Sequence, residues 1–70
     1  MRYAAIIEKS SEGYGAYAPD LPGVGVVGDT VQAVRQLIRE AIDLHLQGLK
    51  EDGQPAPEPS IEIDYVETAA

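Results

Sequence analysis

The sequence predicts one small α+β domain with the element order β-β-β-α-β and a single long helix on one face of the sheet. Three observations predict it: short segments of alternating apolar residues in the first third, a helical apolar pattern in the middle, and another alternating segment near the end. The 70 residues form a single domain, 1–70, close to the lower size limit for an independent hydrophobic core.

Three short strands are expected before the helix. Residues 2–8 alternate Tyr3, Ala5 and Ile7 on one side with Ala4, Ile6 and Glu8 on the other, and they end at the turn-rich residues 9–13. Residues 14–18 and 24–27 follow the same rule, so the first two strands should form a hairpin. Gly15 and Gly25 lie inside these strands, where glycine often marks a bulge or a close approach of backbones.

A helix is expected from about residue 29 to residue 52. Apolar residues recur at helical spacing on one broad face, and either Asp29 or Thr30 is suited to cap its start. Gly53 is a typical residue for ending a helix, and the prolines at 55, 57 and 59 prevent its continuation.

The final segment, residues 60–67, has the pattern of a half-buried strand. Ile61, Ile63 and Tyr65 alternate with Glu62 and Asp64. We expect this strand to lie parallel to the first strand and to pair with it through a right-handed crossover. Because one helix covers only one face of such a sheet, the remaining apolar surface predicts a homo-oligomer, most simply a dimer.

Composition narrows the function further. The net charge of −7 disfavours direct nucleic-acid binding, which needs clustered Lys and Arg. There is no cysteine, so disulfides and thiolate metal sites are excluded, and no apolar run is long enough to span a membrane. These features predict a cytoplasmic protein that needs no cofactor.

Catalytic chemistry is not indicated. His45, the single histidine, lies on the apolar face of the expected helix and is interpreted as a structural residue that donates a hydrogen bond to a carbonyl or a Tyr hydroxyl. The element order is also that of the start of a ribonuclease-H-like fold, but residues 4–6 carry no carboxylate where a metal-dependent nuclease needs one. A small acidic ligand-binding or nuclease-like domain, using Glu8, Asp29 and Asp64, is the alternative interpretation.

One motif is more specific than these patterns. Pro19-Asp20-Leu21-Pro22-Gly23 forms a rigid loop between two expected strands, Gly28-Asp29-Thr30 opens the helix, and Pro59-Ser60 follows it. In this, the chain resembles the HicB-like antitoxins over nearly its whole length. It departs from them at Val24, where the family commonly has Cys. Full antitoxins of this kind usually append a DNA-binding domain, and we expect this chain to lack it.

The resemblance implies a partial ribonuclease-H-like sheet without enzymatic activity. It also implies a HicA-like partner, a small basic RNA-cleaving toxin that the antitoxin binds and masks. The rigid loop, the neighbouring strand and the acidic final segment are then the expected contact regions, with Tyr17, Asp20, Leu21, Glu62 and Asp64 as candidate partner-binding residues.

Overall fold

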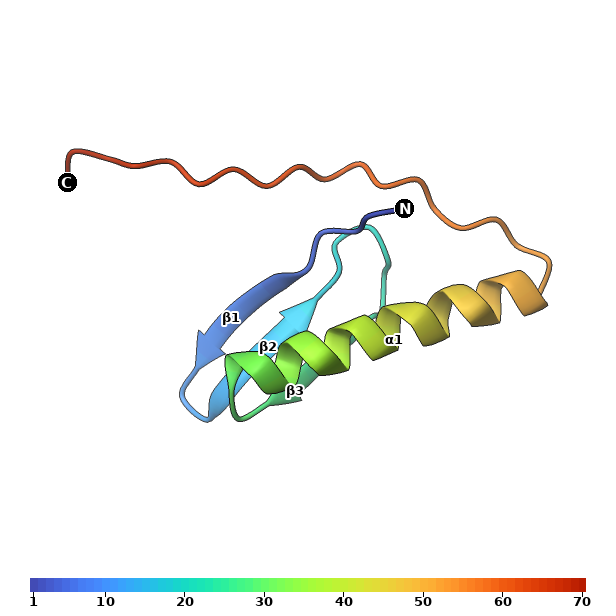
Figure 1. Ribbon diagram of the computed structural model, residues 1–70, viewed down its shortest axis with the longest axis horizontal. Helices are drawn as coiled ribbons and strands as arrows, with labels where there is room; N and C mark the ends of the chain where they lie inside the picture. The colour runs from blue at the N-terminus through green and yellow to red at the C-terminus, as the bar shows by residue number, and fades with distance from the viewer.

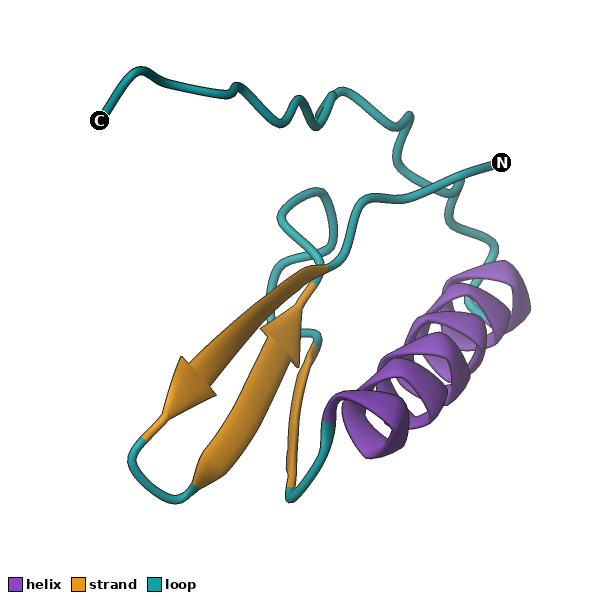
Figure 2. Ribbon diagram, turned by 60° about the vertical axis from the view of Figure 1, so that its left-hand side comes forward, coloured by secondary structure: helices purple, strands orange, loops and turns teal.

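The computed structural model describes residues 1–70 and contains three strands followed by one helix. The elements are β1 (Ile6–Ser10), β2 (Gly13–Tyr17), β3 (Gly25–Gly28) and α1 (Val31–Glu51). The strands form one antiparallel sheet in the order β1-β2-β3, and α1 lies across one face of it (Figures 1 and 2). The predicted α+β class is therefore confirmed. β1 lies a few residues later than the sequence-based bounds, and β2 and β3 are each displaced by one residue.

The strand register separates two faces of the sheet. Ile7 pairs with Ala16, which pairs with Val26, and these three side chains point toward α1 because alternate residues share a face. The β1–β2 turn is only two residues long, since Ser10 pairs with Gly13. At Gly13, φ is 141° and an added Cβ would lie 2.6 Å from the Gly28 carbonyl oxygen, so this turn requires glycine.

The helix ends resolve the alternatives that the sequence left open. Thr30 caps the start, because its Oγ1 accepts a hydrogen bond from the Ala33 N–H at 3.0 Å. Gly53 follows the helix with φ 73°, its N–H bonds to the Lys50 carbonyl, and the next N–H, from Gln54, bonds to the Leu49 carbonyl. This pair of bonds is a Schellman motif, so the predicted end at Gly53 is confirmed.

The hydrophobic core is small. Six side chains are buried, from β2, from α1 and from residues 18–24 between β2 and β3, which we call the Pro-Gly loop. They are Ala16, Ala18, Leu21, Val24, Val34 and Ile38. The loop is closed by backbone hydrogen bonds from the Leu21 N–H to the Ala18 carbonyl and from the Val24 N–H to the Leu21 carbonyl. This closure turns Leu21 inward until none of it is exposed. Leu21 is therefore a core residue, and the expectation that it contacts a partner is wrong.

The expected fourth strand is not formed. Residues 54–70 have no regular secondary structure, and the segment 60–67 pairs with no strand. In both views this segment runs back along the molecule and stands apart from the sheet and the helix (Figures 1 and 2). The radius of gyration is 13.8 Å, against about 11 Å for a compact chain of this length. The expected parallel pairing of residues 60–67 with the first strand is therefore wrong.

The helix α1 is not apolar enough over its length to span a membrane.

Candidate functional site

The sheet face opposite α1 is open, and we call it the outer face. It is formed by Glu8, Gly15, Tyr17, Gly25 and Val27, which line a shallow hollow of about 390 Å³. Tyr17 is 44% exposed and Val27 is 80% exposed. An aromatic and an aliphatic side chain beside an acid are suited to contact a partner protein rather than to perform a reaction.

The two strand glycines keep the outer face flat. A Cβ added at Gly15 would come no closer than 3.7 Å to another atom, and one at Gly25 would come within 3.4 Å of the Ala16 carbonyl oxygen. Pairing with the neighbouring strands is unbroken at both positions, so the bulge that glycine often marks is absent. The missing side chains instead leave backbone open to an approaching molecule.

Asp20 connects the Pro-Gly loop to the C-terminal segment. Its Oδ1 accepts a hydrogen bond from the Ser60 hydroxyl at 2.6 Å, and its Oδ2 accepts bonds from the N–H groups of Ser60 at 2.9 Å and Ile61 at 3.3 Å. The Ser60 hydroxyl, and then its N–H, hold the pKa of the Asp20 carboxyl below its usual value, against a smaller opposing effect of burial. Asp20 therefore fixes the path of the chain after Ser60.

The other predicted site residues lie apart from Asp20. Glu62 and Asp64 are exposed on the C-terminal segment, and Tyr17 lies on the outer face. The hydrogen bonds that Asp20 accepts from Ser60 and Ile61, which we call the clasp, are the only ones that join the Pro-Gly loop to the C-terminal segment. The structure thus gives Asp20 a positioning role and leaves Tyr17, Glu62 and Asp64 accessible.

No cluster of potential metal ligands accompanies these surfaces. Glu8, Asp29 and Asp64 are not gathered into a group of acids that could hold a metal ion. His45 is partly buried on α1 and its imidazole forms no hydrogen bond, so the expected bond to a carbonyl or a Tyr hydroxyl is absent.

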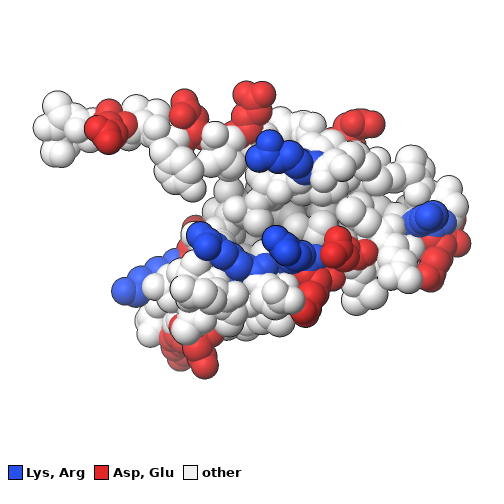
Figure 3. All heavy atoms as spheres, in the orientation of Figure 1, with Lys and Arg blue, Asp and Glu red and all other residues white.

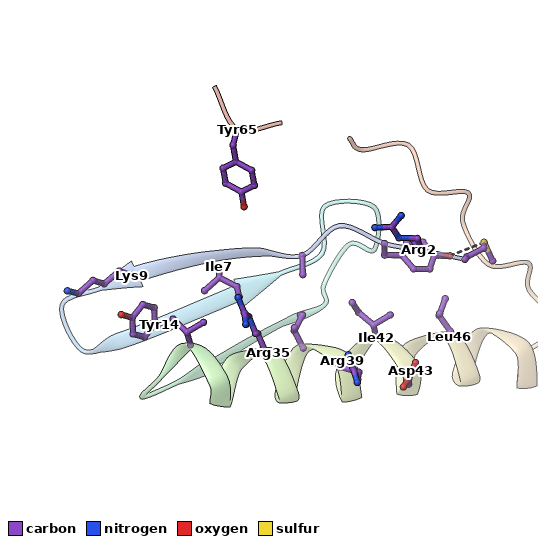
Figure 4. A pocket seen from close by; sticks show the side chains of 15 residues that line it. Arg2, Ile7, Lys9, Tyr14, Arg35, Arg39, Ile42, Asp43, Leu46 and Tyr65 are labelled. Atoms are coloured by element: carbon purple, nitrogen blue, oxygen red, sulfur yellow. Dashed lines mark hydrogen bonds between the residues drawn. The ribbon is translucent and has the colours of Figure 1, made fainter. Parts of the chain in front are cut away.

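A second surface, which sequence reasoning missed, lies between β1 and α1. Here α1 packs against β2 and β3 and has little contact with β1, which leaves a groove of about 920 Å³ that we call the β1–α1 groove (Figure 4). Four of the five basic residues of the chain line it, Arg2, Lys9, Arg35 and Arg39, with Asp43 as the one acid. In the space-filling view the basic side chains gather around the hollow beneath the C-terminal segment (Figure 3). The helical spacing of Arg35 and Arg39 was the available signal.

The outer face and the β1–α1 groove are thus the two surfaces that the fold presents. The sequence matches the model of the HicB-like antitoxin of bacterial toxin-antitoxin systems over residues 3–69. The chain belongs to this family, and the predicted resemblance is confirmed.

Two other proteins are similar to this chain over most of its length. A protein of Haemophilus phage HP1, described as an uncharacterized 14.9 kDa protein in the rep-hol intergenic region, is 35% identical over 94% of this chain and 50% of its own length. The UPF0150 protein ssr1765 of Synechocystis is 39% identical over 79% of this chain and 71% of its own. The chain thus spans about half the length of the phage protein.

Solved structures show the same fold. A chain in the HicA3 and HicB3 toxin-antitoxin complex matches with a TM-score of 0.70 and 32% identity, over 86% of this chain and 70% of that one. The crystal structure of the antitoxin HicB3 matches with the same TM-score and identity, over 86% of this chain and 44% of that one.

Proposed function

We propose that this protein is an antitoxin that binds a HicA-type toxin and masks its RNA-cleaving surface. The observation that carries the proposal is the match to the HicA3 and HicB3 toxin-antitoxin complex, at a TM-score of 0.70 over 86% of this chain. Masking requires binding alone, and the open outer face offers a surface for such binding.

The outer face is the proposed contact surface. A protein that acts on RNA carries a basic surface, and this chain has a net charge of −7. Most of its basic side chains line the β1–α1 groove, so the outer face, whose one charged residue is Glu8, avoids them. A basic partner is therefore attracted by the whole molecule and repelled least at this face.

Tyr17 is the proposed anchor on the outer face. It is an exposed aromatic residue beside open glycine backbone, and aromatic side chains at the centre of interfaces commonly contribute about 2 kcal/mol or more. Glu62 and Asp64 add negative charge on the exposed C-terminal segment, which speeds association more than it raises affinity. Asp20 contributes by fixing the start of that segment.

Titration against a HicA-type toxin from the same genome tests the proposal. We expect a complex with the unmodified protein, and an affinity at least tenfold lower for Tyr17→Ala. Leu44→Ala is the matched control, because Leu44 is 72% exposed on α1 and away from the outer face. Its affinity should be unchanged.

Glycine substitutions test the same face sterically. Gly15→Ala fits the folded chain, since its Cβ would meet only one atom at 3.7 Å, but it places a methyl group on the outer face. Gly48→Ala adds a methyl group in open space on α1 and is the control. If Gly15→Ala and Tyr17→Ala bind the toxin as well as the controls do, the outer face is not the interface; if the unmodified protein does not bind, the antitoxin proposal itself fails.

A further inference from the structure

The free edge of β1 is a further surface at which this protein can bind another chain, in addition to the outer face. β1 pairs only with β2, so the backbone groups along its other edge have no strand partner. Such an edge favours the addition of another strand. The β1–α1 groove opens beside this edge and is lined by apolar residues such as Ile7, Ile38 and Ile42.

The C-terminal segment is the second observation. Its apolar side chains are exposed, with Ile61 at 42%, Ile63 at 47%, Tyr65 at 91% and Val66 at 76%. The clasp at Asp20 holds the start of the segment, and the Tyr3 hydroxyl donates a further hydrogen bond to the Pro57 carbonyl at 2.6 Å. The segment is therefore held in an extended conformation, and its alternating apolar side chains are not covered by its own chain.

Within one chain, the C-terminal segment does not pair with the free edge of β1. A cavity of about 430 Å³ separates Ile61 and Ile63 from residues 2–4, which lead into β1. Tyr65 points toward the groove but remains almost fully exposed (Figure 4). The clasp thus holds the segment above the β1 edge and leaves a gap where another extended chain fits.

The charge of the β1–α1 groove indicates which kind of segment binds there. Four basic residues and one acid line the groove, which favours an acidic segment over a basic one. Residues 61–67 contain no basic residue, and their apolar residues alternate as an added strand requires. Glu67 shares the side of Ile61, Ile63 and Tyr65, so it is the acid that faces the basic groove when these apolar residues cover it. The basic partner expected at the outer face does not match this groove.

We propose that two copies of this chain associate by exchanging residues 61–67, each adding its C-terminal segment as a strand to the β1 edge of the other. Ile61, Ile63 and Tyr65 of one copy then cover the β1–α1 groove of its partner. The alternating acids Glu62 and Asp64 face the other side of the sheet, which is the side of Glu8 and Tyr17. The exchange completes both cores and leaves the outer face open.

Solution mass tests the association. Light scattering of the full chain should give twice 7.5 kDa at micromolar concentration, and Ile63→Glu should give a monomer. Leu44→Glu makes the same change at an exposed residue outside the groove and should remain a dimer. A monomeric unmodified chain, or equal masses for the two variants, would overturn the proposal.

Cross-linking distinguishes exchange from folding back within one chain. The protein has no cysteine, so Arg39→Cys in the groove and Tyr65→Cys in the segment can be combined in one chain and joined by a short bifunctional maleimide. We expect a covalent dimer on a denaturing gel. An internally linked monomer as the main product would overturn exchange, as would equal dimer yield from a chain with Leu44→Cys in place of Arg39→Cys. Neither experiment contains toxin, so failure here leaves the proposed antitoxin function standing.

Discussion

Replacement of Leu21 by alanine should strongly destabilise the fold. Leu21 is fully buried, and the change removes three carbons, worth about 0.8 kcal/mol each in transfer from water. The cavity left behind adds to this, so we expect a loss of about 3 kcal/mol in the free energy of unfolding. A domain of this size is stable by about 4 to 10 kcal/mol, which makes the loss a large fraction of the total.

Urea denaturation at a fixed protein concentration measures this loss. With a slope of about 1 kcal/mol per molar urea, the midpoint should fall by about 3 M, and Leu21→Val gives a milder case if the alanine variant does not fold. Leu44→Ala is the matched control, because Leu44 is 72% exposed, and its effect should stay within about 0.5 kcal/mol. Equal midpoints for Leu21→Ala and Leu44→Ala would refute the assignment of Leu21 to the core.

Other substitutions follow from the helix ends and the loop clasp. Gly48→Ala should raise the melting temperature, by about 0.5–1 kcal/mol in stability, because Gly48 lies within α1 and its added Cβ meets nothing within 4 Å. Gly53→Ala should lower it, since φ there is 73°; the same sign for both would contradict the end of α1 at Gly53. Thr30→Ala removes the cap bond to Ala33 and should cost about 1 kcal/mol in denaturant titration, while no change would contradict the cap. The lowered pKa of Asp20 means that the unfolded chain takes up the proton more readily than the folded chain. Its stabilisation is therefore complete above the ordinary Asp pKa of about 3.9 and is lost as the pH falls through the lower folded value. Asp20→Asn should therefore make the free energy of unfolding less dependent on pH in this acid range. If the variant has the same pH dependence as the unmodified protein, the hydrogen bonds to Asp20 are not its cause.

Sequence patterns predicted the elements with local causes. The alternation at Ile7, the capping side chain at Thr30 and the glycine at Gly53 each act within a few residues, and the structure has a strand, a helix start and a helix end at these places. Asp29 and Thr30 were not distinguishable as caps beforehand, because both residue types accept the same hydrogen bond.

Features that depend on distant packing were not predictable. Leu21 was expected at a surface, since its loop is rich in proline and glycine, but loop closure turns it into the core. Alternation at Ile61, Ile63 and Tyr65 predicted a strand paired with β1, but this segment pairs with no strand of its own chain. The β1–α1 groove depends on how α1 crosses the sheet, which no local pattern encodes.

Inhibition of RNA cleavage is the measurement that tests the antitoxin role most directly. A HicA-type toxin from the same genome is incubated with RNA and increasing amounts of this protein, with Tyr17→Ala and Leu44→Ala in parallel. We predict that cleavage stops near equal molar amounts of toxin and protein, that Tyr17→Ala requires a large excess, and that Leu44→Ala acts like the unmodified protein. Cleavage that continues unchanged with the unmodified protein in micromolar excess would contradict the masking of a toxin by this chain.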